Sequence, residues 1–147
     1  MEKKACTFFG HRDSPETIKP KIRTAVIDLI ENHGVTMFYV GNQGNFDRMV
    51  RSVLKEVTTA YPGVGYAVVL AYMPSAKVAN LSEDFSDTML PEGIETVPKR
   101  YAISWRNKWM IDHADYVVTY LVRLQGGAAK FVALAQKRKK QIRSLFD

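Results

Sequence analysis

The sequence contains one cysteine, three histidines and no long hydrophobic run. A single cysteine, Cys6, excludes a disulfide within the chain, and three scattered histidines give no pattern of metal ligands, so we expect no metal. The longest nearly apolar run, Tyr66–Met73, has eight residues, whereas a membrane-spanning helix needs about 20. The first six residues lack the apolar stretch of a signal peptide. We therefore expect a cytoplasmic protein that does not associate with membranes.

Several short motifs are also absent. The chain has no GxGxxG glycine pattern, no glycine followed by Lys-Ser or Lys-Thr, and no GxSxG. These patterns mark dinucleotide sites, phosphate-binding loops and the serine nucleophile of many hydrolases. We therefore predict neither a bound cofactor nor an activated serine.

Length and composition indicate one globular domain over residues 1–147. Hydrophobic residues make up 46% of the chain and charged residues 24%. The net charge is +6, but five of the acids and a single lysine lie between Pro74 and Pro98. The rest of the chain is therefore more basic than the total suggests. A basic body favours anionic partners such as nucleotides or nucleic acid.

The hydrophobic pattern alternates between strands and helices. Short apolar runs predict strands at Ala5–Phe9, Thr36–Val40, Tyr66–Tyr72, Tyr116–Val122 and Gln141–Phe146. Apolar residues spaced by three and four predict helices at Thr17–His33, Asn45–Ala60, Lys99–His113 and Gly127–Lys139. The last strand is interrupted by Arg143, so we place it at an edge of the sheet.

This alternation predicts an α/β fold. We expect a three-layer αβα sandwich, Rossmann-like and doubly wound, with a mostly parallel sheet of about five strands. The segment Pro74–Pro98 has no period and three prolines, so we expect a long acidic loop. In such folds ligands bind at the carboxyl ends of the strands, and the loops after the strands are the place to look for a site.

Two of these loops follow the first and second strands. A tight turn with a solvated arginine would explain the first loop, and a helix-capping acid would explain Asp47. The alternative to these structural roles, for both loops, is that the backbone lies close to a bound anion. In dinucleotide sites an acid in this position accepts from a ribose hydroxyl. The candidate ligand-binding residues here are Gly10, His11, Arg12, Gly41, Asn42, Gly44 and Asp47.

A third loop and one helix add further candidates. Gly126 and Gly127 open the last predicted helix, and Lys130 follows one turn later. A double glycine at a helix N-terminus suits a phosphate, although a flexible turn with a surface lysine explains it equally. In the third predicted helix, Arg106 and Asn107 share a face with apolar residues. Arg106 then needs a partner, either Asp112 or Asp115 or a bound anion.

Taken together, these segments resemble a known superfamily. The stretches CTFFGHRD, RNKWMIDHADYVVTYL and GGAAK, with the glycine loop that runs to Asp47, are similar to the SLOG superfamily of Rossmann-like bacterial proteins. Its members include DNA-processing single-strand-binding proteins and the LOG nucleotide phosphoribohydrolases. The likeness is to the small single-domain members of unknown function. It implies a nucleotide-like ligand, held by the candidate residues above.

Three functions stay open. The first is a ligand-binding or sensor domain for a nucleotide or a nucleotide-derived molecule. The second is an N-glycosidase that acts on a nucleoside monophosphate, with Asp47 or Asp112 stabilising an oxocarbenium-like centre. The chain lacks the PGGxGTxxE glutamate of the LOG hydrolases, so the sequence does not decide whether it is an enzyme. The third is a nucleic-acid binder, ranked last because no aromatic residues interleave with a basic surface. A homo-oligomer is also compatible with the apolar helix faces.

Overall fold

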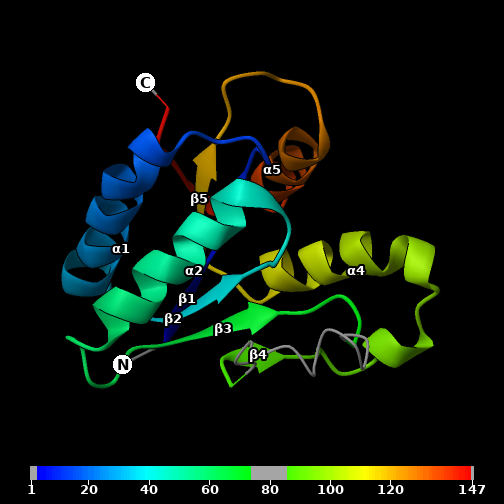
Figure 1. The fold of residues 1–147 in the computed structure, drawn as a ribbon, viewed down its shortest axis with the longest axis horizontal. Helices are drawn as coiled ribbons and strands as arrows, with labels where there is room; N and C mark the ends of the chain where they lie inside the picture. The colour runs from blue at the N-terminus through cyan, green and yellow to red at the C-terminus, as the bar shows by residue number, and fades with distance from the viewer. Residues whose placement is uncertain (1–2, 74–85, 147) are drawn as a thin grey trace.

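A six-stranded sheet forms the centre of the molecule, a computed structural model that describes residues 3–73 and 86–146. Every pairing between neighbouring strands is parallel. The strand order is β4-β3-β2-β1-β5-β6 (Figure 1). The strands are β1 Lys4–Gly10, β2 Val35–Val40, β3 Gly65–Val69, β4 Thr88–Met89, β5 Tyr116–Tyr120 and β6 Gln141–Ser144.

Helices cover both faces of this sheet. They are α1 Lys19–His33, α2 Gly44–Thr58, α4 Lys99–Asp112 and α5 Gly127–Lys137, with 3₁₀ turns at Glu16–Ile18 and Ile94–Thr96. Apolar residues of α1 and α2 pack on one face with Phe8 and Val40, and those of α4 and α5 pack on the other with Phe9 and Val117. This is the predicted doubly wound sandwich. No helix of the described residues is long and apolar enough to cross a membrane.

The helix limits follow from local chemistry. Pro20 lies in the first turn of α1, where a missing N–H removes no helical hydrogen bond. Gly34 ends α1 with φ of 71°, a left-handed conformation that glycine adopts without strain. The last strand, β6, is at an edge of the sheet as predicted.

The acidic segment departs from the prediction of a loop without regular structure. Residues 74–85 of it lie outside the described residues. In the part that is described, β4 pairs with β3, and Asp87 just before it accepts hydrogen bonds from Arg51 and Tyr66. A strand of two residues is too short to show a hydrophobic repeat in the sequence. It is stabilised by pairing with β3 and by the hydrogen bonds of Arg51 and Tyr66 to Asp87. The third predicted strand also ends earlier, at Val69, rather than at Tyr72.

The order of the strands defines where a ligand would bind. From β1 the chain adds β2, β3 and β4 on one side, and α4 then returns it to β5 on the other side of β1. The carboxyl ends of β1 and β5 therefore flank the point where the strand order reverses. Ligands of open α/β sheets bind in the crevice at this point.

Candidate functional site

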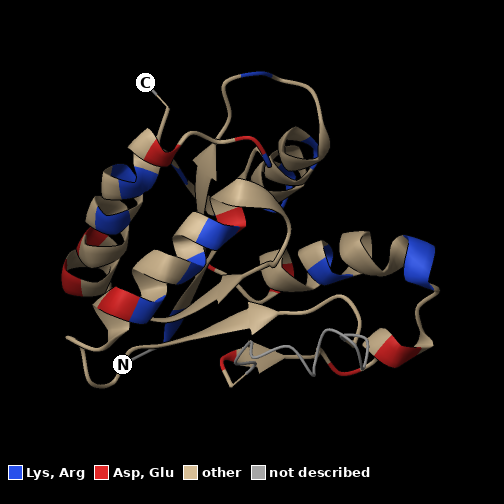
Figure 2. Cartoon of the chain, in the orientation of Figure 1, with Lys and Arg blue, Asp and Glu red and all other residues tan. Residues whose placement is uncertain are grey.

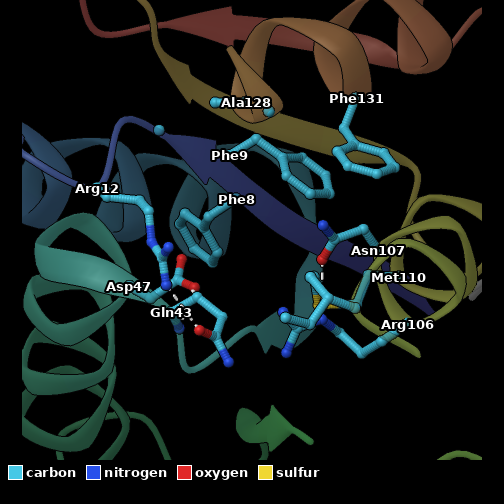
Figure 3. Close-up of a pocket in the computed structure, with 13 residues that line it drawn as sticks. Phe8, Phe9, Arg12, Gln43, Asp47, Arg106, Asn107, Met110, Ala128 and Phe131 are labelled. Atoms are coloured by element: carbon cyan, nitrogen blue, oxygen red, sulfur yellow. Dashed lines mark hydrogen bonds between the residues drawn. The ribbon is translucent and has the colours of Figure 1, made fainter. Parts of the chain in front are cut away.

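A cavity of about 220 Å³ opens at the carboxyl end of β1, between the N-termini of α2 and α5 and beside α4 (Figure 3). Its volume is below the roughly 300–1,000 Å³ of a pocket for a drug-sized ligand, so it can enclose only part of a nucleotide. It is lined by Phe8, Phe9, Gly10, Arg12, Gln43, Asp47, Ile103, Arg106, Asn107, Met110, Gly127, Ala128 and Phe131.

One wall of the cavity is aromatic and apolar. The rings of Phe9 and Phe131 stack with their centroids 5.7 Å apart and an interplanar angle of 20°. Met110 and Ile103 of α4 extend this wall, and Ile103 is 37% exposed. An apolar, partly flat surface of this kind suits a base or another planar group.

Arg106 is the most deeply buried charged group at the cavity, with 1% of its surface exposed. Its Nη1 donates to the carbonyl oxygen of Val69 at 2.7 Å and to Oδ1 of Asn42 at 3.2 Å, and its Nε donates to Oδ1 of Asn107 at 2.8 Å. All three acceptors are neutral. Burial lowers the pKa of Arg106, and the nearby charge of Asp47 opposes this shift.

The predicted partners of Arg106 lie elsewhere. Asp112, at the exposed end of α4, forms an ion pair with Arg138. Asp115 accepts a hydrogen bond from the backbone N–H of Ala5 at 3.0 Å. The expectation of an ion pair between Arg106 and either acid is therefore wrong, because both acids lie at or beyond the carboxyl end of α4, where other donors bind them.

Arg12 approaches the cavity from the loop after β1, and Asp47 approaches it from the first turn of α2. Oδ2 of Asp47 accepts from the backbone N–H of Gln43 at 2.9 Å, and Nη2 of Arg12 donates to Oε1 of Gln43 at 2.8 Å. Figure 3 shows the three side chains side by side. Burial raises the pKa of Asp47 to about 6, against the opposing effects of the Gln43 N–H, Arg106 and Arg12.

The glycines at or just after the ends of β1 and β2 and at the start of α2 are required by internal contacts. A Cβ on Gly10 would lie 2.4 Å from the ring of Phe46, and one on Gly44 would lie 2.7 Å from Cα of Arg12. A Cβ on Gly41 would lie 2.8 Å from Oδ2 of Asp47. These distances are shorter than packed side chains allow. Close packing within the chain thus explains three glycines that the sequence suggested for ligand contact.

The N-terminus of α5 differs. Gly126 has φ of 102° and ψ of 179°, which only glycine adopts readily, and a Cβ on Gly126 or Gly127 would meet no atom within 4 Å. The first backbone N–H groups of a helix have no acceptor within it, and the first turn of α5 contains no acid. The described part of the chain thus offers an open, electropositive helix end at the cavity rim.

The structure brings together seven of the predicted ligand-binding residues around the cavity, and places two more beside it. Gly10, Arg12, Asp47, Arg106, Asn107 and Gly127 line it, Asn42 binds Arg106, and Gly41 and Gly44 support the loop. Gly126 is the N-cap residue of α5, next to Gly127 of the lining. The nearby residues that the sequence did not single out are Phe8, Phe9, Gln43, Ala128 and Phe131.

Three further predicted residues are not among those that line the cavity. His11 is 5% exposed, and its Nε2 accepts from the backbone N–H of Val122 at 3.1 Å, so it ties the first loop to the loop after β5. Lys130 is exposed, with Nζ 5.7 Å from the ring centroid of Phe131. Asp112 does not line the cavity either. Among the described residues no group of three or more His, Cys, Asp or Glu is placed to hold a metal.

The chain matches a known protein in structure but none in sequence. No family model and no curated protein sequence matches the chain. Among solved structures, the X-ray structure of DNA processing protein A (DprA) from Streptococcus pneumoniae is similar, with a TM-score of 0.69 and 12% sequence identity. The similarity covers 96% of this chain and 50% of the other, so the chain spans about half the length of that structure. At this identity the likeness shows the Rossmann-like fold, which the SLOG resemblance also implied.

Proposed function

We propose that this chain binds a nucleotide or a nucleotide-derived small molecule at the cavity between α2, α4 and α5. The observation that carries the proposal is Arg106, a guanidinium that is 1% exposed and bound only to neutral oxygens at the cavity wall. A buried charge is stable only when it is paired, and a bound anion would complete the set of partners.

The remaining walls fit the other parts of such a ligand. Arg12 and the open N-terminus of α5 offer further donors for a phosphate or another anionic group. The stacked rings of Phe9 and Phe131 offer an apolar surface for a base. A nucleotide combines an anionic group with a planar apolar one, so it matches both sides of the cavity.

A thermal-shift screen with nucleotides, cyclic nucleotides, nicotinamide cofactors, ADP-ribose and sugar phosphates tests this proposal. A ligand at 100 times its Kd adds about 2.7 kcal/mol, which corresponds to a rise in Tm of roughly 5–10 °C for a domain of this size. Arg12→Ala should reduce the shift, whereas the matched change Arg123→Ala should keep it, because Arg123 pairs with Asp13 away from the cavity. No shift with any compound would reject the proposal.

Nucleic-acid binding is a second candidate, favoured by a surface that the sequence did not reveal. At the start of α4, Nζ of Lys99 lies 4.9 Å from the ring centroid of Tyr72, and the guanidinium of Arg100 lies 4.8 Å from that of Tyr101. Both tyrosines are exposed, at 40% and 54%. Exposed aromatic residues thus lie beside basic ones at the start of α4, an arrangement that the sequence pattern did not indicate. Figure 2 shows an acidic residue in the 3₁₀ turn just before it. The structural neighbour is named for DNA processing. Oligonucleotide binding that weakens steeply with salt would support this function.

N-glycosidase activity is the third candidate, and Asp47 is the acid that favours it. Asp47 lines the cavity with a pKa of about 6, a value that suits proton transfer near neutral pH. Release of ribose 5-phosphate from a nucleoside monophosphate, lost in Asp47→Asn, would support it. The absence of turnover in a panel of monophosphates that do bind would leave a binding function alone.

A further inference from the structure

Asp47 and Arg106 face each other across one backbone position. A Cβ on Gly41 would lie 2.8 Å from Oδ2 of Asp47 and 3.0 Å from Cζ of Arg106, so the carboxylate and the guanidinium flank the same point. Among the described residues, no carboxylate lies within ion-pair distance of Arg106, and its recorded acceptors are neutral. The carboxylate thus attracts the guanidinium electrostatically over a short distance, but the two groups form no direct ion pair.

The groups that act on Asp47 come from three elements. Arg106 faces it from α4, Arg12 from the loop after β1, and the backbone N–H of Gln43 from the N-cap position of α2. Each of them favours the ionised carboxyl, and burial disfavours it more strongly. Asp47 is therefore the internal counter-charge of a site that contains two guanidinium groups, and it lies where an anionic ligand would add a second negative charge.

We propose that binding of an anionic group in this cavity is coupled to the uptake of one proton by the carboxylate of Asp47. In this step a proton moves from solvent to a carboxylate oxygen, and the ligand anion replaces the carboxylate as the counter-charge of Arg106 and Arg12. Affinity for the anion therefore rises as the pH falls. This inference rests on the proposed ligand-binding function and adds to it a dependence on pH.

Other titratable groups near the cavity do not explain such a dependence. His11 is buried, its pKa is lowered below 6.5 by that burial, and its Nε2 already accepts a hydrogen bond. Asp13 pairs with Arg123, which lowers its pKa. Tyr72 acts on Arg106 only by raising the pKa of the guanidinium. Asp47, with a pKa of about 6, is the carboxyl at the cavity that changes charge near neutral pH.

Sulfate is the probe for this coupling because its own charge stays constant between about pH 5 and about pH 8, which that of a phosphate monoester does not. Its Kd is measured by NMR at both pH values for the native chain, Asp47→Asn and Asp13→Asn. Calorimetry in two buffers of different protonation enthalpy counts the protons taken up. Asp13→Asn is the matched control, since Asp13 is an acid of the loop after β1 that does not line the cavity.

We expect the native chain and Asp13→Asn to bind sulfate roughly a hundredfold more tightly at the lower pH, because a like charge a few ångströms away is removed and because uptake of one proton changes the affinity about tenfold per pH unit above the pKa of Asp47. They should take up close to one proton per sulfate at the higher pH, whereas Asp47→Asn should bind equally at both values and take up none. The same pH dependence in Asp47→Asn, or none in the native chain, would overturn the inference. If the native chain binds nucleotides without proton uptake, the coupling alone fails; if neither nucleotides nor sulfate bind, the proposed function fails with it.

Discussion

The glycines of this site fall into two groups that look alike in the sequence and differ in space. Gly10 at the end of β1, Gly41 after β2 and Gly44 at the start of α2 are pressed against other residues of the same molecule. Gly126 and Gly127, after β5, face open space at the cavity rim. Only the second group leaves its backbone free for a ligand. A glycine-rich loop after a strand therefore indicates either internal packing or a binding surface, and the contacts decide which.

This difference assigns different roles to the two sides of the cavity. The loops after β1 and β2 are a packed support that fixes Arg12 and Asp47 in place. The N-terminus of α5 is an open rim with unpaired backbone donors. Substitutions in the support should therefore change the stability of the fold, and substitutions at the rim should change binding.

The largest effect is expected for Gly10→Ala. The new Cβ would lie 2.4 Å from the ring of Phe46, which is fully buried and cannot move aside without shifting α2. Overpacking of this kind lowers the free energy of unfolding by about 3 kcal/mol. Urea denaturation measures this loss. Gly127→Ala is the control, because its Cβ meets nothing within 4 Å; equal losses in the two variants would contradict the division into support and rim.

The next effect is a gain in stability from Asp47→Asn. The folded-state pKa of Asp47, about 6, is above its ordinary value of 3.8, so the folded chain binds this proton more tightly than the unfolded chain. The free energy of unfolding therefore falls as the pH rises between these two values. Removing the charge should stabilise the fold by about 2 kcal/mol near neutral pH and by almost nothing near pH ~4. Denaturation at the two pH values measures it, and a loss of stability at neutral pH would refute the burial of an unfavourable charge here.

The fold and the site differ in how far the sequence predicts them. Long amphipathic segments such as α2 are clear because their apolar positions recur with one period, and the strand order then brings the loops after β1, β2 and β5 together. Two-residue β4 carries no such signal. Phe9 and Phe131 look like ordinary core residues until the structure places them in one wall. The hydrogen-bond partners of Arg106 could not be predicted from the sequence either. Spacing along α4 suggests Asp112, whereas the sheet places Val69 and Asn42 next to the guanidinium.

A smaller effect on stability, with a clear effect on binding, is expected for Gly127→Ala. Alanine is tolerated at the start of a helix, so the free energy of unfolding should change by less than about 0.5 kcal/mol. The added methyl group would occupy the rim where a ligand approaches the backbone, and nucleotide affinity should fall roughly three- to tenfold. Calorimetry with a compound identified by the screen measures this. Gly65→Ala is the control, since its Cβ would make an ordinary contact of 3.6 Å with Met37 Sδ, far from the rim.

The smallest effect is expected for Asp112→Asn. Asp112 is exposed and pairs with Arg138, and a surface ion pair contributes about 0–1 kcal/mol. Asp112 does not line the cavity, and its carboxylate is bound by Arg138, so ligand affinity should stay within about twofold of the native value. The sequence suggested either Asp47 or Asp112 as the residue that stabilises an oxocarbenium-like centre, and this variant separates them. If Asp112→Asn removed binding or turnover while Asp47→Asn did not, the site would have to include Asp112 and not Asp47, and the assignment of the site to the cavity described above would be refuted.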